Sequence, residues 1–131
     1  MIAVDTSVVV RYLTDDPTEL AHRARALLDG SDAVGVPVVV LLETGHVLRT
    51  QYGVSRADVL EVLIELVTRA NVELLGLPKE VALGALARAR QLPDAPFADA
   101  LIAATAREAG AASLASFDRG MRRHGIDIVE P

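Results

Sequence analysis

Four acidic residues interrupt stretches of the sequence that are otherwise apolar. Asp5 and Asp118 each follow an apolar run with the composition of a buried strand, and Glu43 and Asp99 lie near the beginnings of apolar helical segments. A carboxylate in apolar surroundings is costly unless it is paired, hydrogen-bonded or bound to a metal ion. One such acid is most simply a helix cap or half of an ion pair. Four of them, without four comparable bases, indicate a shared cation.

The carboxylate ligands indicate which cation would bind and what chemistry it would support. Carboxylate oxygens are hard ligands that suit Mg²⁺ or Mn²⁺, and the chain has no cysteine to offer a soft one. One or two such ions lower the pKa of a bound water, polarise a phosphoryl group and stabilise charge on a leaving oxygen. We therefore predict metal-dependent hydrolysis of a phosphodiester, with one or two ions. The predicted ligands and catalytic residues are Asp5, Glu43, Asp99 and Asp118.

Three hydroxyl side chains stand close to these acids in the sequence. Thr6 and Ser7 follow Asp5 directly, and Ser116 precedes Asp118 by two residues. At a helix N-terminus such groups can hold a ligand water or a phosphate oxygen. Asp5 also has a structural interpretation, as the N-cap of the helix that begins at Thr6.

A parallel sheet would bring these side chains to one edge. Short apolar runs alternate with helical segments, which predicts a single α/β domain, residues 1–131, with three α/β/α layers and a parallel central sheet. In such sheets the ligand sites lie at the carboxyl ends of the strands. The strands are expected at residues 2–4, 33–37, 72–75, 111–117 and 127–129, and the helices at residues 6–13, 17–29, 38–52, 55–70, 79–91 and 98–109.

Two of the helix starts carry capping signals. Asp16 precedes Pro17 and has Glu19 three residues later, which predicts Asp16 as the N-cap and Pro17 as the first helical residue. Ser55 has Asp58 three residues later and predicts a second capped start. The helix after Ser55 is apolar round more than half of its circumference, so part of it is expected to serve a partner.

Composition limits the classes of function. With 131 residues the chain has room for one sizeable core. A net charge of −5 argues against a simple electrostatic binder of nucleic acid, although bound divalent ions reverse the local charge. Apolar runs such as residues 36–42 are too short to span a bilayer, and an acid at position 5 is foreign to a signal peptide. We expect a cytoplasmic protein without a membrane segment.

Four segments carry a resemblance to a known family. They are residues 2–7 (Ile-Ala-Val-Asp-Thr-Ser), 41–44 (Leu-Leu-Glu-Thr), 97–106 (Phe-Ala-Asp-Ala-Leu-Ile-Ala-Ala-Thr-Ala) and 116–119 (Ser-Phe-Asp-Arg). In this order, and over the whole length of the chain, they resemble the PIN-domain nucleases. The resemblance is closest to the VapC toxins of prokaryotic toxin–antitoxin pairs.

The resemblance implies an activity and partners. It assigns the acidic site to the same four carboxylates, with the three hydroxyls as polar support. It implies an endoribonuclease that depends on Mg²⁺ or Mn²⁺, an RNA substrate, a homodimer and a cognate VapB-type antitoxin that blocks the site. Arg11 and Arg119 are then candidates for RNA contact, with solvated surface charge as the alternative. The chain departs from the family pattern before Asp99, where Pro96 is close and the nearest further acid is Asp94.

Three other interpretations stay open at this point. A haloacid-dehalogenase-like phosphatase would use Asp5 as a nucleophile, but it needs a second Asp where this chain has Ser7. A di-iron carboxylate bundle would use Glu43 and His46, an E-x-x-H pair, but it needs a second such pair. A non-catalytic interaction module with vestigial acids is the third, although all four acids are intact.

Overall fold

Parallel strands joined by helices make up the computed structural model, which describes residues 1–131. The chain falls into two compact units, Met1–Lys79 and Glu80–Pro131. Both units are of the α/β class with parallel strands, so the predicted fold class is confirmed. The single domain over residues 1–131 stays a prediction. None of the helices is long and apolar enough to cross a membrane.

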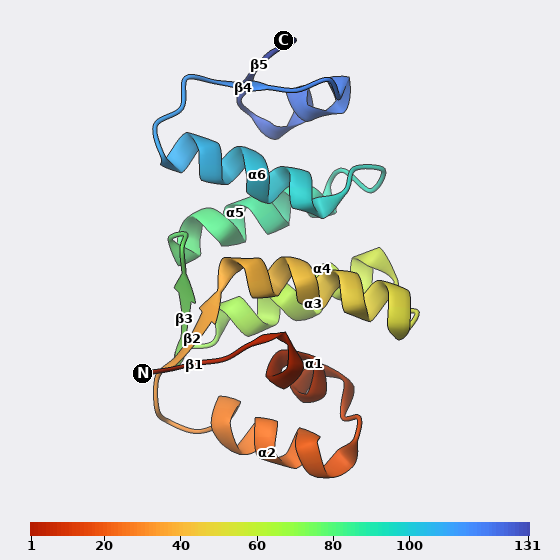
Figure 1. Ribbon diagram of the computed structural model, residues 1–131, viewed down its shortest axis with the longest axis vertical. Helices are drawn as coiled ribbons and strands as arrows, with labels where there is room; N and C mark the ends of the chain where they lie inside the picture. The colour runs from red at the N-terminus through yellow and green to blue at the C-terminus, as the bar shows by residue number, and fades with distance from the viewer. The chain divides into compact units, whose positions relative to one another are not determined.

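The first unit contains a three-stranded parallel sheet in the order β1-β2-β3, with the helices of the two crossovers beside it (Figure 1). Its strands are β1 (Ile2–Ala3), β2 (Val34–Pro37) and β3 (Val72–Leu75), and its helices are α1 (Thr6–Thr14), α2 (Thr18–Leu28), α3 (Val38–Gln51) and α4 (Arg56–Thr68). Helix α1 packs against α2 and α3, and α3 packs against α4. Because β1 and β2 are parallel, the residues that follow them lie at the same edge of the sheet.

The middle strand, β2, has room for no side chain at Gly35. Val34 and Val36 of β2 are fully buried, and Val34 is paired with Val72 of β3. A Cβ on Gly35 would lie 2.9 Å from Leu75 Cδ1 and 3.0 Å from Met1 Sδ, so no larger residue fits there without a shift. The Leu75 and Met1 side chains therefore lie directly against the backbone of β2 at Gly35.

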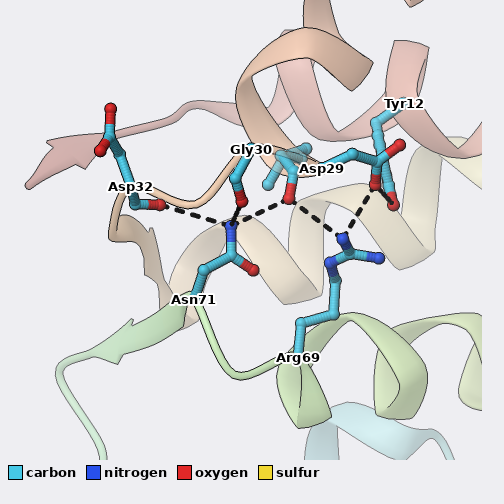
Figure 2. Close-up of polar contacts among 7 residues, drawn as sticks. Tyr12, Asp29, Gly30, Asp32, Arg69 and Asn71 are labelled. Carbon is cyan, nitrogen blue, oxygen red and sulfur yellow. Dashed lines mark hydrogen bonds and ion pairs between the residues drawn. The ribbon is translucent and has the colours of Figure 1, made fainter.

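The opposite edge of this sheet is held by the amide of Asn71 (Figure 2). Its Nδ2 donates to the carbonyl oxygens of Leu28 at 3.0 Å, Gly30 at 3.1 Å and Asp32 at 3.4 Å. With two N–H groups for three acceptors, the amide must share one hydrogen. Asn71 thus ties the loop between α2 and β2 to the residue before β3.

Arg69 adds a second connection at the same place (Figure 2). Its guanidinium donates to the Leu28 carbonyl at 3.2 Å and pairs with Asp29 at 2.9 Å. The Tyr12 hydroxyl also donates to Asp29, at 2.6 Å, and the Arg69 guanidinium lies 5.7 Å from the Tyr12 ring centre. The last carbonyl of α2 is therefore satisfied by Arg69 and Asn71 from the α4–β3 connection, and Tyr12 of α1 binds the Asp29 carboxylate that follows the helix.

The second unit contains two helices, a short two-stranded parallel sheet and a 3₁₀ helix (Figure 1). Its elements are α5 (Lys79–Arg90), α6 (Phe97–Glu108), β4 (Ser113–Ala115), η1 (Arg119–His124) and β5 (Asp127–Val129). Helix α6 packs against η1 and β4, and Ser113 of β4 is paired with Asp127 of β5. Small side chains such as Ala82, Ala85 and Ala104 are buried in this unit.

Several local predictions can be compared with the structure. The Ser55 cap is confirmed, because its Oγ accepts from the Asp58 N–H at 3.2 Å. The Asp16 cap is wrong: α2 begins at Thr18, Pro17 occupies the N-cap position, and no side chain caps the helix. Pro17 has no N–H and takes an extended conformation there, which moves the helix start by one residue.

Residues 119–124 form the helix η1, which is not among the segments expected from the sequence. In α4 the Val62 and Ile64 side chains are half-buried and the other valines and leucines are buried. The expectation that part of this helix serves a partner stays a prediction.

Candidate functional site

Asp5 caps helix α1 and keeps one oxygen free of protein donors. It is extended, directly after β1, and its Oδ1 accepts from the Ser7 N–H at 3.0 Å, the Ser7 hydroxyl at 2.6 Å and the Val8 N–H at 3.4 Å. All three donors bind the same oxygen, and Oδ2 has none. The structural interpretation of Asp5 as an N-cap is therefore correct, and it leaves half of the carboxylate available to a ligand.

The same donors keep Asp5 ionised. The Ser7 hydroxyl, followed by the Val8 amide, holds the pKa of the Asp5 carboxyl below its usual value. Hydrogen bonds to the charged form favour it, and slight burial opposes them without overcoming them. The carboxylate is negatively charged at neutral pH and is a ready ligand for a cation.

Glu43 is joined to the start of α1 by Thr6. The Thr6 hydroxyl donates a short hydrogen bond to Glu43 Oε1, across 37 residues of sequence. Glu43 lies in the second turn of α3, which follows β2, and β2 is parallel to the strand that leads to Asp5. The structure therefore brings Asp5 and Glu43 to one edge of the sheet, each hydrogen-bonded to a hydroxyl at the start of α1.

The second unit holds the other two acids. Asp99 is the third residue of α6 and is half-buried, and Asp118 is the N-cap of η1. Asp118 Oδ1 accepts from the Gly120 N–H at 2.8 Å, and the Asp118 N–H donates to the Ser116 hydroxyl at 2.9 Å. Ser116 therefore shapes the turn that presents Asp118, as Ser7 does for Asp5.

The four acids are more exposed than the sequence implies. Asp5, Glu43 and Asp118 are exposed and Asp99 is half-buried, so the inference that apolar neighbours bury them is wrong. Each acid lies at or near a helix start, where neighbouring aliphatic side chains turn to the core and the carboxylate turns to the edge. Within neither unit do three Asp, Glu or His side chains form a ready metal-binding group. The gathering of all four stays a prediction.

The donor chemistry of the first unit fits a hard divalent cation. Asp5 Oδ2 and Glu43 Oε2 are carboxylate oxygens without a protein donor, on residues that two hydroxyls hold in place. The N-terminus of α1 lies at the same point, where the helix dipole favours an anionic ligand, although the Ser7 and Val8 N–H groups of its first turn already donate to Asp5. These features support metal binding but do not identify the metal.

The candidate RNA contacts differ in their surroundings. Arg11 is half-buried, its Nε has no partner, and with Ser7 and Arg23 it lines a pocket of about 440 Å³ between α1 and α2. Arg119 is exposed at the start of η1. Asp94 is an exposed residue of the loop before α6.

His124 is a residue that the sequence analysis missed. Its side chain is 1% exposed and neither ring nitrogen has a hydrogen-bond partner, whereas His22 and His46 are exposed. Burial lowers the pKa of His124. Asp99 opposes this effect, and three arginines reinforce it: Arg123, Arg88 and Arg107. The sequence around His124 does not predict its burial, because the residues that cover it come from distant segments.

Acid should weaken the fold through His124. The unfolded chain takes up a proton at this site near pH 6.5, and the folded chain does so only at lower pH, so the free energy of unfolding falls as the pH drops below about 6.5. One proton limits the slope to about 1.4 kcal/mol per pH unit. Urea unfolding between pH 7.5 and 5.5 should show this slope in the wild type and in His46→Gln, and lose it in His124→Leu. An unchanged slope in His124→Leu would refute the assignment.

Comparison with protein-family models identifies the family of the chain. The family model described as PIN domain matches residues 2–126. This range includes the four predicted acids and the three hydroxyls, and it covers nearly all of both units. No curated protein is significantly similar to the chain.

Proposed function

Because the chain belongs to the PIN domain family, whose members are generally metal-dependent nucleases, we propose that it is an endoribonuclease that uses Mg²⁺ or Mn²⁺. The observation that carries the proposal is the family match over residues 2–126, which includes every predicted ligand. The pairing of Asp5 and Glu43 through Thr6 supports it from the structure. The phosphatase alternative has no such support. Ser7 stands where that mechanism needs a second Asp, and its hydroxyl donates a hydrogen bond to Asp5.

The residues of the chain would act mainly by positioning. Ser7 and Val8 orient Asp5 so that its second oxygen points away from the helix amides, and Thr6 orients Glu43. Asp5, Glu43, Asp99 and Asp118 would hold the divalent cation, which would supply an activated water and would neutralise charge on the phosphate. The positive end of the α1 dipole would favour the incoming phosphodiester.

The test is cleavage of a labelled RNA with the metal and one acid varied. We expect cutting with Mg²⁺ or Mn²⁺, none in EDTA, and recovery when Mn²⁺ is restored. Asp99→Asn should cut at least about 100-fold more slowly, because loss of a ligand exceeds the 10- to 100-fold cost of losing an outer-shell partner.

Asp94→Asn is the matched control for Asp99→Asn. It removes the same charge from an exposed loop five residues away and should cut at the wild-type rate. Equal rates for wild type and Asp99→Asn would contradict the metal site. No cutting of any RNA by the wild type with either metal would favour the non-catalytic interaction module.

We further propose that the enzyme is the cytoplasmic toxin of a type II toxin–antitoxin pair, a homodimer held inactive by a VapB-type antitoxin. The resemblance of residues 2–7, 41–44, 97–106 and 116–119 to the VapC toxins supports this role. Expression should arrest growth, and coexpression of a small neighbouring gene should relieve the arrest. Growth arrest that persists with every neighbouring gene, or no arrest at all, would leave the nuclease without this role.

A further inference from the structure

Two arginines of the second unit converge on one glycine. Gly125 follows η1 with φ of +74°, a conformation that side chains disfavour. A Cβ at Gly125 would overlap Arg88 Nη1 and lie 3.4 Å from Arg107 Nη1. The absent side chain therefore leaves room for both guanidinium groups, one from α5 and one from α6, over the same backbone atom.

Neither guanidinium has a carboxylate partner. The ion pairs of the chain are Arg25 with Asp15 and Arg69 with Asp29. Arg107 donates to the carbonyl of His124, a neutral acceptor, and the Arg88 guanidinium makes no hydrogen bond. Two like charges held together without a counterion repel each other, and an anion placed between them removes that repulsion.

A groove leads to these arginines. It has a volume of about 370 Å³ and runs between α5 and α6 over a floor of small residues that includes Gly84 and Ala104. Nothing lies within 4 Å of a Cβ on Gly84, so the groove is open above it. Glu80 and Glu108 also line the groove, but neither is within 4.0 Å of a cationic nitrogen. The space suits a group of nucleotide size.

We propose that Arg88 and Arg107 form a phosphate-binding site that holds the RNA backbone away from the scissile bond. The planar guanidinium donates two parallel hydrogen bonds, a geometry that matches phosphate oxygens. This assignment rests on the proposed function for its ligand, since the same site would also accept a free phosphate. Arg88 and Arg107 would bind a phosphate of the RNA backbone that does not react. Their role would be to position the substrate.

The test is equilibrium binding of a labelled single-stranded RNA in EDTA, where no cleavage occurs. The Arg88→Gln, Arg107→Gln double variant should bind at least about tenfold more weakly than the wild type. Loss of two phosphate contacts should reduce the slope of log Kd against log salt by about 1.4, at about 0.7 per contact for a single strand. The slope does not depend on the fraction of folded protein. It therefore separates a loss of phosphate contacts from partial unfolding of the variant. Arg88→Gln alone keeps the Arg107 bond to His124 and should show half of the change.

Arg90→Gln is the matched control, since Arg90 is exposed on the same helix but does not line the groove. It should lower the slope less than Arg88→Gln does. Equal affinities and slopes for Arg88→Gln and Arg90→Gln would overturn the proposal. Calorimetry with inorganic phosphate separates the two sources of ligand. Phosphate binding lost in Arg88→Gln with unchanged RNA binding would mean a site for free phosphate, and would also overturn the RNA assignment.

The outcome is independent of the nuclease claim. If wild type and Asp99→Asn fail to cut but the arginine variants lose RNA binding, the proposed activity is wrong and the phosphate site stands. If cleavage depends on Asp99 but the arginine variants bind normally, the reverse holds.

Discussion

Asp5→Asn should abolish RNA cleavage and leave the fold nearly as stable as the wild type. The substitution removes the negative charge that a divalent cation needs, so the rate should fall at least about 100-fold. It keeps an oxygen that can accept from Ser7 and Val8, and Asn caps helices as well as Asp does. Cleavage assays and urea unfolding on the same preparation measure both effects, and the free energy of unfolding should change by no more than about 0.5 kcal/mol.

Two controls separate the cap from the ligand. Asp5→Ala should lose cleavage and also about 1 kcal/mol of stability, because it removes the acceptor for the first turn of α1. Ser55→Ala removes the cap of α4 and should cost about the same stability with no loss of cleavage by the folded protein. Wild-type cleavage by Asp5→Asn would refute Asp5 as a ligand, and a large loss of stability would show that the charge itself supports the fold.

Asn71→Ala should lower the free energy of unfolding by about 2 kcal/mol. The amide donates to the part-buried Leu28 carbonyl at the end of α2 and to the exposed Gly30 and Asp32 carbonyls in the loop to β2. Truncation removes all three hydrogen bonds, although Arg69 remains as a donor to Leu28 and water can reach the other two carbonyls. A hydrogen bond contributes about 1 kcal/mol net, and this partial replacement limits the total loss to about 2 kcal/mol. Urea unfolding monitored by circular dichroism measures the change.

Asn71→Asp sharpens this test, because it keeps the shape of the side chain and removes both N–H donors. The carboxylate would then face carbonyl oxygens, so Asn71→Asp should be less stable than Asn71→Ala. Gln91→Ala, at an exposed amide after α5, should change stability by less than about 0.5 kcal/mol. An Asn71→Asp variant as stable as the wild type would show that the amide hydrogens are not used.

Local patterns in the sequence were enough to predict the class of fold. Alternating apolar runs located every strand, and β3 was predicted at its observed bounds, because strand burial leaves a signal in neighbouring residues. The Ser55 cap was predictable for the same reason, since donor and acceptor are three residues apart. The Asp16 cap failed because the position of Pro17 depends on how the turn after α1 closes.

The site was only partly predictable. The roles of Thr6 and Ser7 followed from their position after Asp5, but the bond from Thr6 to Glu43 spans 37 residues and depends on how α1 lies against α3. The exposure of the acids was misjudged, because aliphatic neighbours in the sequence need not be neighbours in space. The burial of His124 and the pairing of Arg88 with Arg107 at Gly125 are equally non-local, and no periodicity encodes them.

The hydrogen bonds made by Asn71 also affect the rate at which the protein unfolds. Its bond to Leu28 joins residues 43 apart in sequence, next to the point where Val34 donates to the Asn71 carbonyl at 2.8 Å. It therefore forms only when β2 and β3 are already in register, after the closure of a long loop. Interactions that form late in folding act mainly on the reverse step, so replacing Asn71 should speed unfolding and leave refolding almost unchanged. Asn71 would thus lengthen the lifetime of the folded sheet.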